Sequence, residues 1–209
     1  MLLTIFFSSF AIAFSGAMMP GPLLTATIGE STRRGVMAGP LLIVGHGILE
    51  SLLLAGLWLG LAPYLQGDRF FVAIAVTGAV TLFWMAATML RSLPGLRLTR
   101  EKEERGTGHL VAAGALLSIA NPYWLIWWGT IGLGYIVQSM QFGIRGVLFF
   151  FCGHILADLI WYSIVSAMVA RGRRFLSDRL YRGLIGGCAV LLLVFGCWFA
   201  YAGLARIIA

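Results

Sequence analysis

The sequence predicts an all-α integral membrane protein with six transmembrane helices, arranged as two inverted repeats of three helices each. Apolar residues make up 60% of the 209 positions, charged residues make up 11%, and the mean hydropathy is +0.92. Six apolar stretches are long enough to cross a bilayer, and motifs of the first three recur in the last three. Because soluble domains carry about 25% charged residues, the composition excludes a soluble domain, a disordered chain and a disulfide scaffold.

The six apolar stretches define the expected spans in chain order. A helix needs about 20 apolar residues to cross a bilayer. Lipid offers no partner for unpaired backbone groups, so each stretch is expected to be helical. The approximate limits of the stretches are Leu2–Ile28, Val36–Tyr64, Phe70–Leu90, Leu110–Val137, Gly146–Ala170 and Gly183–Ala205.

Positive charge is distributed unevenly between the expected loops. Twelve Lys and Arg residues follow the first, third and fifth stretches, including Arg33 and Arg34 in the first loop, and three lie on the opposite side. The positive-inside rule therefore places the twelve in the cytoplasm and both termini outside the cell inner membrane. The net charge is +7, and the basic residues lie in short loops between apolar segments. This placement favours anionic membrane lipid over nucleic acid as their partner.

Two acidic residues lie inside apolar spans, and each follows a histidine by four positions. His46 precedes Glu50 in the second stretch, and His154 precedes Asp158 in the fifth, each time after a glycine. This spacing puts each pair on one face of a helix. Intramembrane acids indicate function by default. We expect the four residues to couple protons or to bind a substrate ammonium; the alternative is a structural pair that holds the two helices together.

Prolines interrupt two of the stretches at corresponding places. Pro20-Gly21-Pro22 interrupts the first stretch and Asn121-Pro122 interrupts the fourth. Each half contains three spans, an odd number, so the second half must be inverted, as in many transporters. The expected organisation is 1–92 for the first repeat, 93–109 for a charged cytoplasmic linker, and 110–209 for the second repeat. Alternating access would come from one half rocking against the other.

The proline breaks predict a substrate site, because a half-helix that begins inside a membrane exposes amide donors to a carboxylate. The alternative is a kink that serves packing alone. Trp124 belongs either to an aromatic wall or, with Trp127 and Trp128, to an interfacial belt, which tryptophan favours. The expected substrate-binding residues are Pro20, Gly21, Pro22, Thr25, Asn121, Pro122 and Trp124.

The sequence contains three cysteines and no recognisable cofactor motif. The cysteines lie inside apolar runs without CxxC spacing, so we expect small buried apolar residues rather than a disulfide or a metal site; they are Cys152, Cys188 and Cys197. No motif predicts a cofactor.

These motifs together resemble the LysE/RhtB-type amino-acid exporters along essentially the whole chain. The residues that carry the resemblance are Pro20-Gly21-Pro22, Arg34-Gly35, Ala38-Gly39, Gly45, Glu50, Gly78, Leu90-Arg91-Ser92, Asn121-Pro122, Asp158 and Trp161. The resemblance implies six helices in two inverted halves, frequently a homodimer, and export of amino acids driven by the proton-motive force. Glu50 stands where this family commonly has Asp, and aromatic residues replace the Lys-Ala that frequently follows Asn-Pro.

The sequence thus predicts an exporter of a small amino acid or related zwitterion in the inner membrane, coupled to protons, and not an enzyme. One alternative is a divalent metal-ion exporter that uses the His and carboxylate residues of the second and fifth spans. Another is a membrane-embedded enzyme with a His–acid pair, although no nucleophile or cofactor motif accompanies the pair. A non-transporting membrane scaffold is the remaining alternative.

Overall fold

The computed structural model is helical throughout its described part, which comprises all residues except 20, 62–67, 97–107, 173–176 and 209. Pro20 and most of the expected linker 93–109 therefore lie outside the described residues. The first half contains α1 (Leu2–Ala17), α2 (Pro22–Arg34), α3 (Ala38–Gly56), η1 (Leu57–Leu61), α5 (Asp68–Ser92) and η2 (Leu93–Gly95). The second half contains α6 (Gly108–Ile119), α7 (Pro122–Trp127), η3 (Trp128–Gly132), α8 (Leu133–Met140), α9 (Gly143–Gly172) and α10 (Asp178–Ile208).

Four helices of the described chain are long and apolar enough to cross a membrane by themselves. They are Ala38–Gly60, Asp68–Gly95, Gly143–Gly172 and Asp178–Ile207. Two further pairs of helices, α1 with α2 and α6 with Tyr123–Met140, meet the same criterion together but bend by 76° and 64° at their junctions. The chain is therefore a multi-pass membrane protein with four to six candidate spans.

The turn between α2 and α3 differs from the loop expected there. Arg33 and Arg34 form the last turn of α2, where basic side chains complement the helix dipole. Gly35 then closes the turn with φ at 81°, a left-handed conformation that glycine adopts without the penalty of a side chain.

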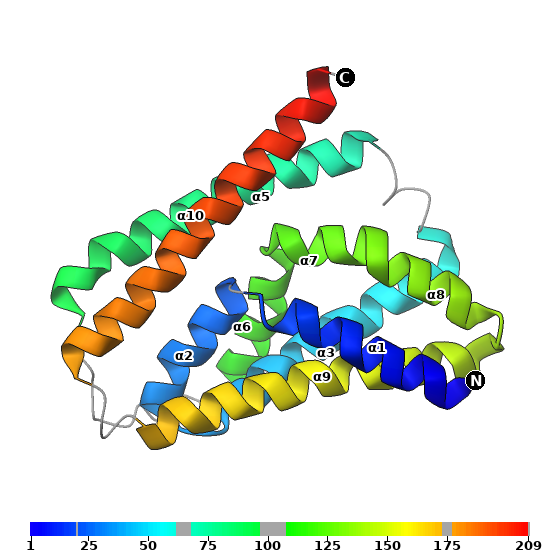
Figure 1. The fold of residues 1–209 in the computed structure, drawn as a ribbon, viewed down its shortest axis with the longest axis horizontal. Coiled ribbons are helices and arrows are strands. Elements are labelled where there is room, and N and C mark those ends of the chain that lie inside the picture. Colours follow the sequence, from blue (N-terminus) through cyan, green and yellow to red (C-terminus); the bar gives the residue numbers. More distant parts are fainter. Residues whose placement is uncertain (20, 62–67, 97–107, 173–176, 209) are drawn as a thin grey trace.

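The helices pack mainly between the two halves of the sequence. In Figure 1, α1 lies along α9, α3 packs on α6 and α9, and α5 runs antiparallel to α10 as a separate pair. Each helix of one half is thus held by a helix of the other half. The expectation that one half rocks against the other stays a prediction; such a motion would separate the α1–α9, α3–α6 and α5–α10 interfaces.

Glycines permit two of these interfaces to be very close. A Cβ atom on Gly45 of α3 would overlap the backbone carbonyl of Val111 on α6, and one on Gly153 of α9 would overlap the carbonyl of Phe6 on α1. Each glycine directly precedes a histidine, so close helix contact at the glycine fixes where that histidine points.

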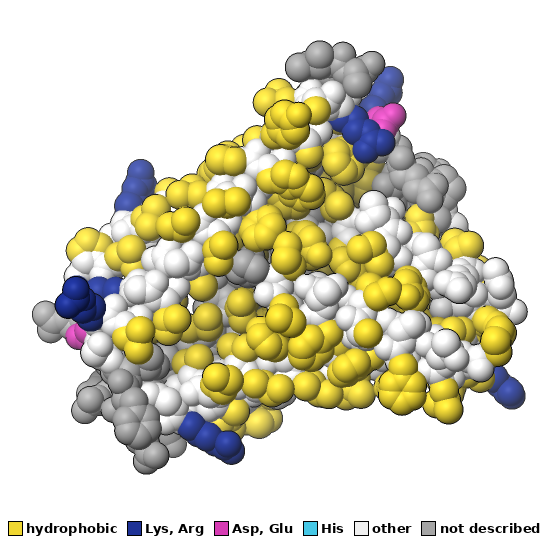
Figure 2. Space-filling model, viewed as in Figure 1, with side chains coloured by type: hydrophobic (Ala, Val, Ile, Leu, Met, Phe, Trp, Pro, Cys, Tyr) yellow, Lys and Arg dark blue, Asp and Glu magenta, His cyan; other side chains and the backbone are white. Residues whose placement is uncertain are grey.

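The outer surface is apolar around the middle of the molecule. Figure 2 shows hydrophobic side chains across the centre of one face and Arg side chains at its two ends. Large apolar residues such as Trp84 and Tyr201 are exposed there, as expected for contact with lipid. The expectation of buried cysteines is wrong: Cys152 and Cys197 are exposed and Cys188 is half-buried, all three as free thiols. Their helix faces point outward because a thiol is apolar enough to face lipid.

Candidate functional site

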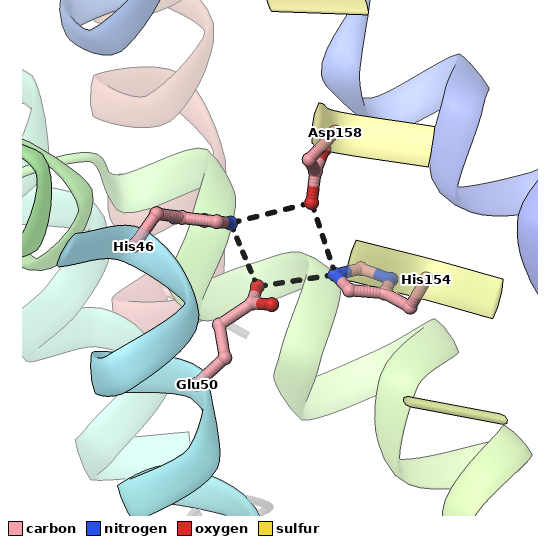
Figure 3. Close-up of side chains that lie close together, drawn as sticks. All are labelled: His46, Glu50, His154 and Asp158. Atoms are coloured by element: carbon pink, nitrogen blue, oxygen red, sulfur yellow. Dashed lines mark hydrogen bonds and ion pairs between the residues drawn. The ribbon is translucent and has the colours of Figure 1, made fainter. Parts of the chain in front are cut away.

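The two His–acid pairs meet in one cluster at the contact between α3 and α9. Within each pair, Nε2 of His46 lies 3.0 Å from Oε1 of Glu50, and Nε2 of His154 lies 3.5 Å from Oδ2 of Asp158. Between the helices, His46 lies 3.4 Å from Asp158 and His154 lies 3.1 Å from Glu50. Figure 3 shows the resulting four-membered ring, in which nitrogen and oxygen alternate. We refer to these four residues as the tetrad.

The tetrad is almost completely removed from solvent. Glu50 is fully buried, and the other three members are between 5% and 6% exposed. A buried carboxylate without donors would cost several kcal/mol. The helical spacing predicted each pair; the contact between the pairs depends on how α3 packs on α9.

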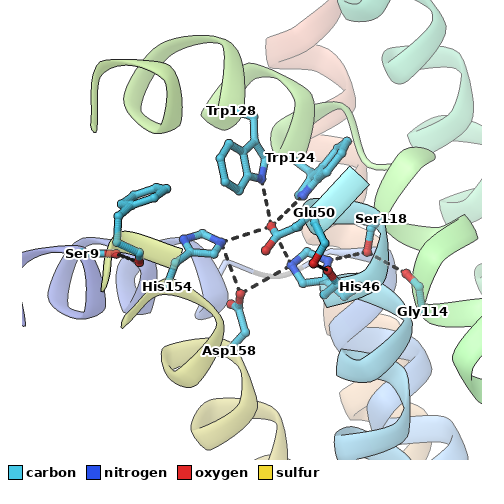
Figure 4. Close-up of polar contacts among 12 residues, drawn as sticks. Ser9, His46, Glu50, Gly114, Ser118, Trp124, Trp128, His154 and Asp158 are labelled. Carbon is cyan, nitrogen blue, oxygen red and sulfur yellow. Dashed lines mark hydrogen bonds and ion pairs between the residues drawn. The ribbon is translucent and has the colours of Figure 1, made fainter. Parts of the chain in front are cut away.

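Two tryptophans complete the surroundings of Glu50. The indole nitrogens of Trp124 and Trp128 donate to Glu50 Oε1 at 3.0 and 2.8 Å, as Figure 4 shows. Trp124, Trp127 and Trp128 are at least 92% buried, so the expectation that they form an interfacial belt is wrong. Tryptophan usually prefers the membrane interface, but here the buried Glu50 carboxylate needs N–H donors, and the indoles supply them.

His46 has a further partner that the sequence analysis missed. Its Nδ1 lies 2.7 Å from Oγ of Ser118 on α6, and the Ser118 hydroxyl donates to the carbonyl of Gly114 at 2.7 Å. The only signal in the sequence was a polar residue three positions before Asn121 in an apolar stretch. For His154, Nδ1 is buried without a hydrogen-bond partner among the described residues.

One cavity reaches both the tetrad and the junctions of the bent helices. All four tetrad residues line it, as do Gly21, Asn121 and Trp124. Leu82, Phe195 and Phe199 of the α5–α10 pair form an apolar wall of the same cavity. Its empty volume, open side included, is about 740 Å³.

The two half-helix starts that were expected to bind substrate differ. Pro22 is buried at the first position of α2, where no side chain caps the helix. Pro122 begins α7, but there the side chain of Asn121 already accepts a hydrogen bond from the amide of Tyr123. A Cβ on Gly21 would lie 3.4 Å from the Asn121 amide nitrogen, so the two starts adjoin. The amides of α2 are the ones left for a ligand.

Of the expected substrate-binding residues whose side chains the structure describes, Pro22 and Thr25 are not among those that line the cavity. The buried hydroxyl of Thr25 makes no hydrogen bond to an N or O atom of the described residues. Its neighbour Thr27 bonds to its own helix, at the carbonyl of Leu23.

The donor atoms of the tetrad would also suit a cation. Four atoms, two imidazole nitrogens and two carboxylate oxygens, lie within 4.8 Å of one another. Such a mixed set binds several divalent metals. However, Glu50 Oε1 already lies within 3.1 Å of four ring nitrogens, and two of these are tryptophan N–H groups that cannot be deprotonated.

Comparisons with known proteins assign the chain to a family. A family model described as the LysE type translocator matches residues 14–203. The chain belongs to the LysE family. Over 201 residues it is 31% identical to the "Chemotactic transduction protein ChpE" of Pseudomonas aeruginosa, covering 92% of this chain and 95% of ChpE. No solved structure matches it.

A second relative of this LysE-type translocator carries a name that refers to transport. It is the "Putative amino acid efflux protein YcgF" of Bacillus subtilis, 25% identical over 211 residues, which span 99% of this chain and all of YcgF. Members of the family are transporters, so a LysE-type chain with several apolar helices is a membrane transporter.

Proposed function

We propose that this LysE-type translocator exports a small amino acid or a related zwitterion from the cytoplasm in exchange for protons. The observation that carries the proposal is the buried tetrad, in which two acids from different helices share a cavity with the start of a half-helix. Such a cavity offers separate partners for the two charges of a zwitterion.

Each end of the substrate has a partner of opposite charge in this proposal. The carboxylate would bind at the uncapped start of α2, near Gly21 and Pro22, where helix amides favour an anion. The ammonium group would bind between Glu50 and Asp158, replacing donors that the histidines otherwise supply. Trp124 lines the cavity between them and limits the size of the substrate side chain.

The proposed topology is six spans in two inverted repeats, 1–92 and 110–209, joined by the linker 93–109. The interfaces α1–α9 and α6–α3 are the pair that a two-fold axis relating the halves would interchange, which supports the proposal. In Figure 1 the N-terminus lies at the lower right and the C-terminus at the top, and the ends of α2 and α9 lie at the lower left, away from both. The charge distribution then favours the inner membrane with the termini outside.

Transport in inverted membrane vesicles tests the function. We expect labelled small amino acids to accumulate when a pH gradient is imposed. Glu50→Gln and Asp158→Asn should each reduce this uptake by tenfold or more, equivalent to about 1.4 kcal/mol, while the protein stays folded in the membrane. Glu30→Gln is the matched control, because Glu30 pairs with Arg34 at the end of α2 away from the tetrad. Normal uptake by both tetrad variants would reject the proposed role of the acids.

The alternative of a divalent metal exporter finds no support in the family or in the names of the relatives. A thermal shift assay separates the two cargoes, because a ligand that binds only the folded state raises the melting temperature. We expect stabilisation by millimolar amino acid. A shift with zinc or manganese instead, lost in the double variant His46→Ala/His154→Ala, would favour the metal.

A further inference from the structure

We propose that the coupling proton resides on His46 rather than on His154, and that Ser118 is the positioning residue that makes the two histidines unequal. The inference rests on the proposed proton-coupled function and adds which residue of the tetrad carries the proton. It follows from the hydrogen bonds around the two imidazole rings.

The hydrogen bonds of His46 require a proton on each ring nitrogen. We assign the single hydroxyl proton of Ser118 to the carbonyl of Gly114, 2.7 Å away, which leaves Ser118 Oγ as the acceptor at its other contact. The contact at 2.7 Å to Nδ1 of His46 is therefore an N–H donated by the ring. The Nε2 atom faces Glu50 and Asp158 at 3.0 and 3.4 Å, and with both acids ionised these contacts are attractive only if Nε2 carries a proton. His46 is then an imidazolium.

His154 needs only one proton. Its Nε2 lies 3.1 Å from Glu50 Oε1 and must donate there, because that oxygen also accepts from two indoles. Its Nδ1 is buried without a hydrogen-bond partner among the described residues. A proton on Nδ1 would leave a buried N–H of a cation unpaired, which is costly. His154 is thus the neutral ring with its proton on Nε2.

Equivalent contacts in the two halves show why Nδ1 of His46 has a hydrogen-bond partner and Nδ1 of His154 has none among the described residues. The close approach of Gly45 to Val111 corresponds to that of Gly153 to Phe6. The approach of Gly114 to the Leu42 carbonyl corresponds to the hydrogen bond from Ser9 to the Phe150 carbonyl, which is one of the contacts drawn in Figure 4.

These correspondences fix the residue that stands opposite His154. In both pairs of contacts, a residue of α6 corresponds to the residue of α1 that lies 105 positions earlier, and a residue of α3 corresponds to the residue of α9 that lies 108 positions later. The counterpart of Ser118 is then Ala13, a buried residue of the cavity wall that has no hydroxyl. The first half therefore offers no acceptor where the second half offers Ser118.

The other titratable groups around His46 are consistent with one imidazolium in the tetrad. The titratable groups that share its cavity are Glu50 on its own helix, His154, Asp158 and Tyr162 on α9, and Tyr123 on α7; α6 contributes Ser118. One imidazolium opposite two carboxylates leaves one negative charge in the cluster. An arriving ammonium group supplies the N–H donors that the imidazolium supplied before. Proton and substrate therefore compete for the same acids, as exchange requires.

Nitrogen-15 NMR of histidine-labelled protein tests the assignment without relying on transport. The chain contains three histidines, and His109→Gln removes the exposed one. Near neutral pH we expect one imidazolium and one neutral ring protonated at Nε2. Ser118→Ala should lower the pH at which the imidazolium loses its proton by about one to two units, since a charge-assisted hydrogen bond is lost. Ser118→Thr should restore the wild-type value.

Two further variants make the test specific. Ser139→Ala removes another buried serine hydroxyl, one without a partner among the described residues, and should leave both rings unchanged. Ala13→Ser should raise the protonation pH of His154 by offering it the missing acceptor. Two identical rings, or an unchanged titration in Ser118→Ala, would overturn the inference. An absence of amino acid uptake in wild-type vesicles would instead reject the proposed function and leave the ring assignment standing.

Discussion

Replacing Gly45 with alanine tests whether close packing of α3 on α6 sets the position of His46. The added Cβ would overlap the backbone carbonyl of Val111, which cannot rotate away as a side chain would. The two helices must separate by on the order of 1 Å to regain an ordinary contact distance. The hydrogen bond from His46 to Ser118, now 2.7 Å, spans the same interface and would be lost.

The expected magnitudes follow from the two opposing effects of the substitution. Overpacking costs about 3 kcal/mol at the upper end of its range, and alanine in place of glycine recovers about 1 kcal/mol of helix propensity. A net loss of about 2 kcal/mol lowers the melting temperature of a chain of this size by about 4–8 °C. Displacement of a binding side chain by about 1 Å should reduce transport about a hundredfold.

The assays are thermal unfolding of the purified protein and uptake into vesicles, each compared with a matched glycine. Gly187→Ala on α10 is that control, because its Cβ would meet nothing within 4 Å. It should be neutral or stabilise by up to about 1 kcal/mol through helix propensity. If Gly45→Ala melted and transported like Gly187→Ala, the proposed role of the close contact would be refuted.

Two other predictions concern the buried carboxylate and the topology. Trp128→Phe removes the shortest donor to the buried Glu50 carboxylate and should destabilise the protein by about 1.5–3 kcal/mol in thermal unfolding. Trp84→Phe, on the exposed surface, should change stability by less than about 0.5 kcal/mol. In a variant without native cysteines, Gln141→Cys should react with an impermeant thiol reagent in intact cells and Ser92→Cys should not; the reverse pattern would invert the proposed orientation.

The sequence predicted the local features of the candidate site well. Spans can be read from apolar length, and most helix ends lie within a turn of the expected limits; Gly143–Gly172, for example, was expected as Gly146–Ala170. The spacing of four between His46 and Glu50 placed both on one helix face, and the structure confirms their contact at 3.0 Å.

Contacts between helices could be predicted only as alternatives. Periodicity describes one helix at a time, so a pair that holds the second and fifth spans together was one alternative, and the contact of α3 with α9 depends on packing. The same limitation explains the error at Trp128. Its composition-based preference is for an interface, and only the packing of η3 over α3 reveals a buried acceptor for its indole. Ser118 was missed because one serine in an apolar helix is usually bonded to its own backbone.

The arrangement of the helices indicates where the moving boundary of the transporter lies. The α5–α10 pair makes its main contact with the rest of the molecule through α7, and it lines the cavity with apolar side chains alone, Leu82, Phe195 and Phe199. The tetrad, the tryptophans and Ser118 all belong to the other helices. A shift of the α5–α10 pair can therefore open the cavity without breaking any of these hydrogen bonds. A boundary between the two halves would instead pass through the tetrad and leave Glu50 without its donors from α7 and α9. Removing the donors of a buried carboxylate costs more free energy than separating apolar side chains. We therefore expect access to alternate by movement of the α5–α10 pair against a fixed polar site.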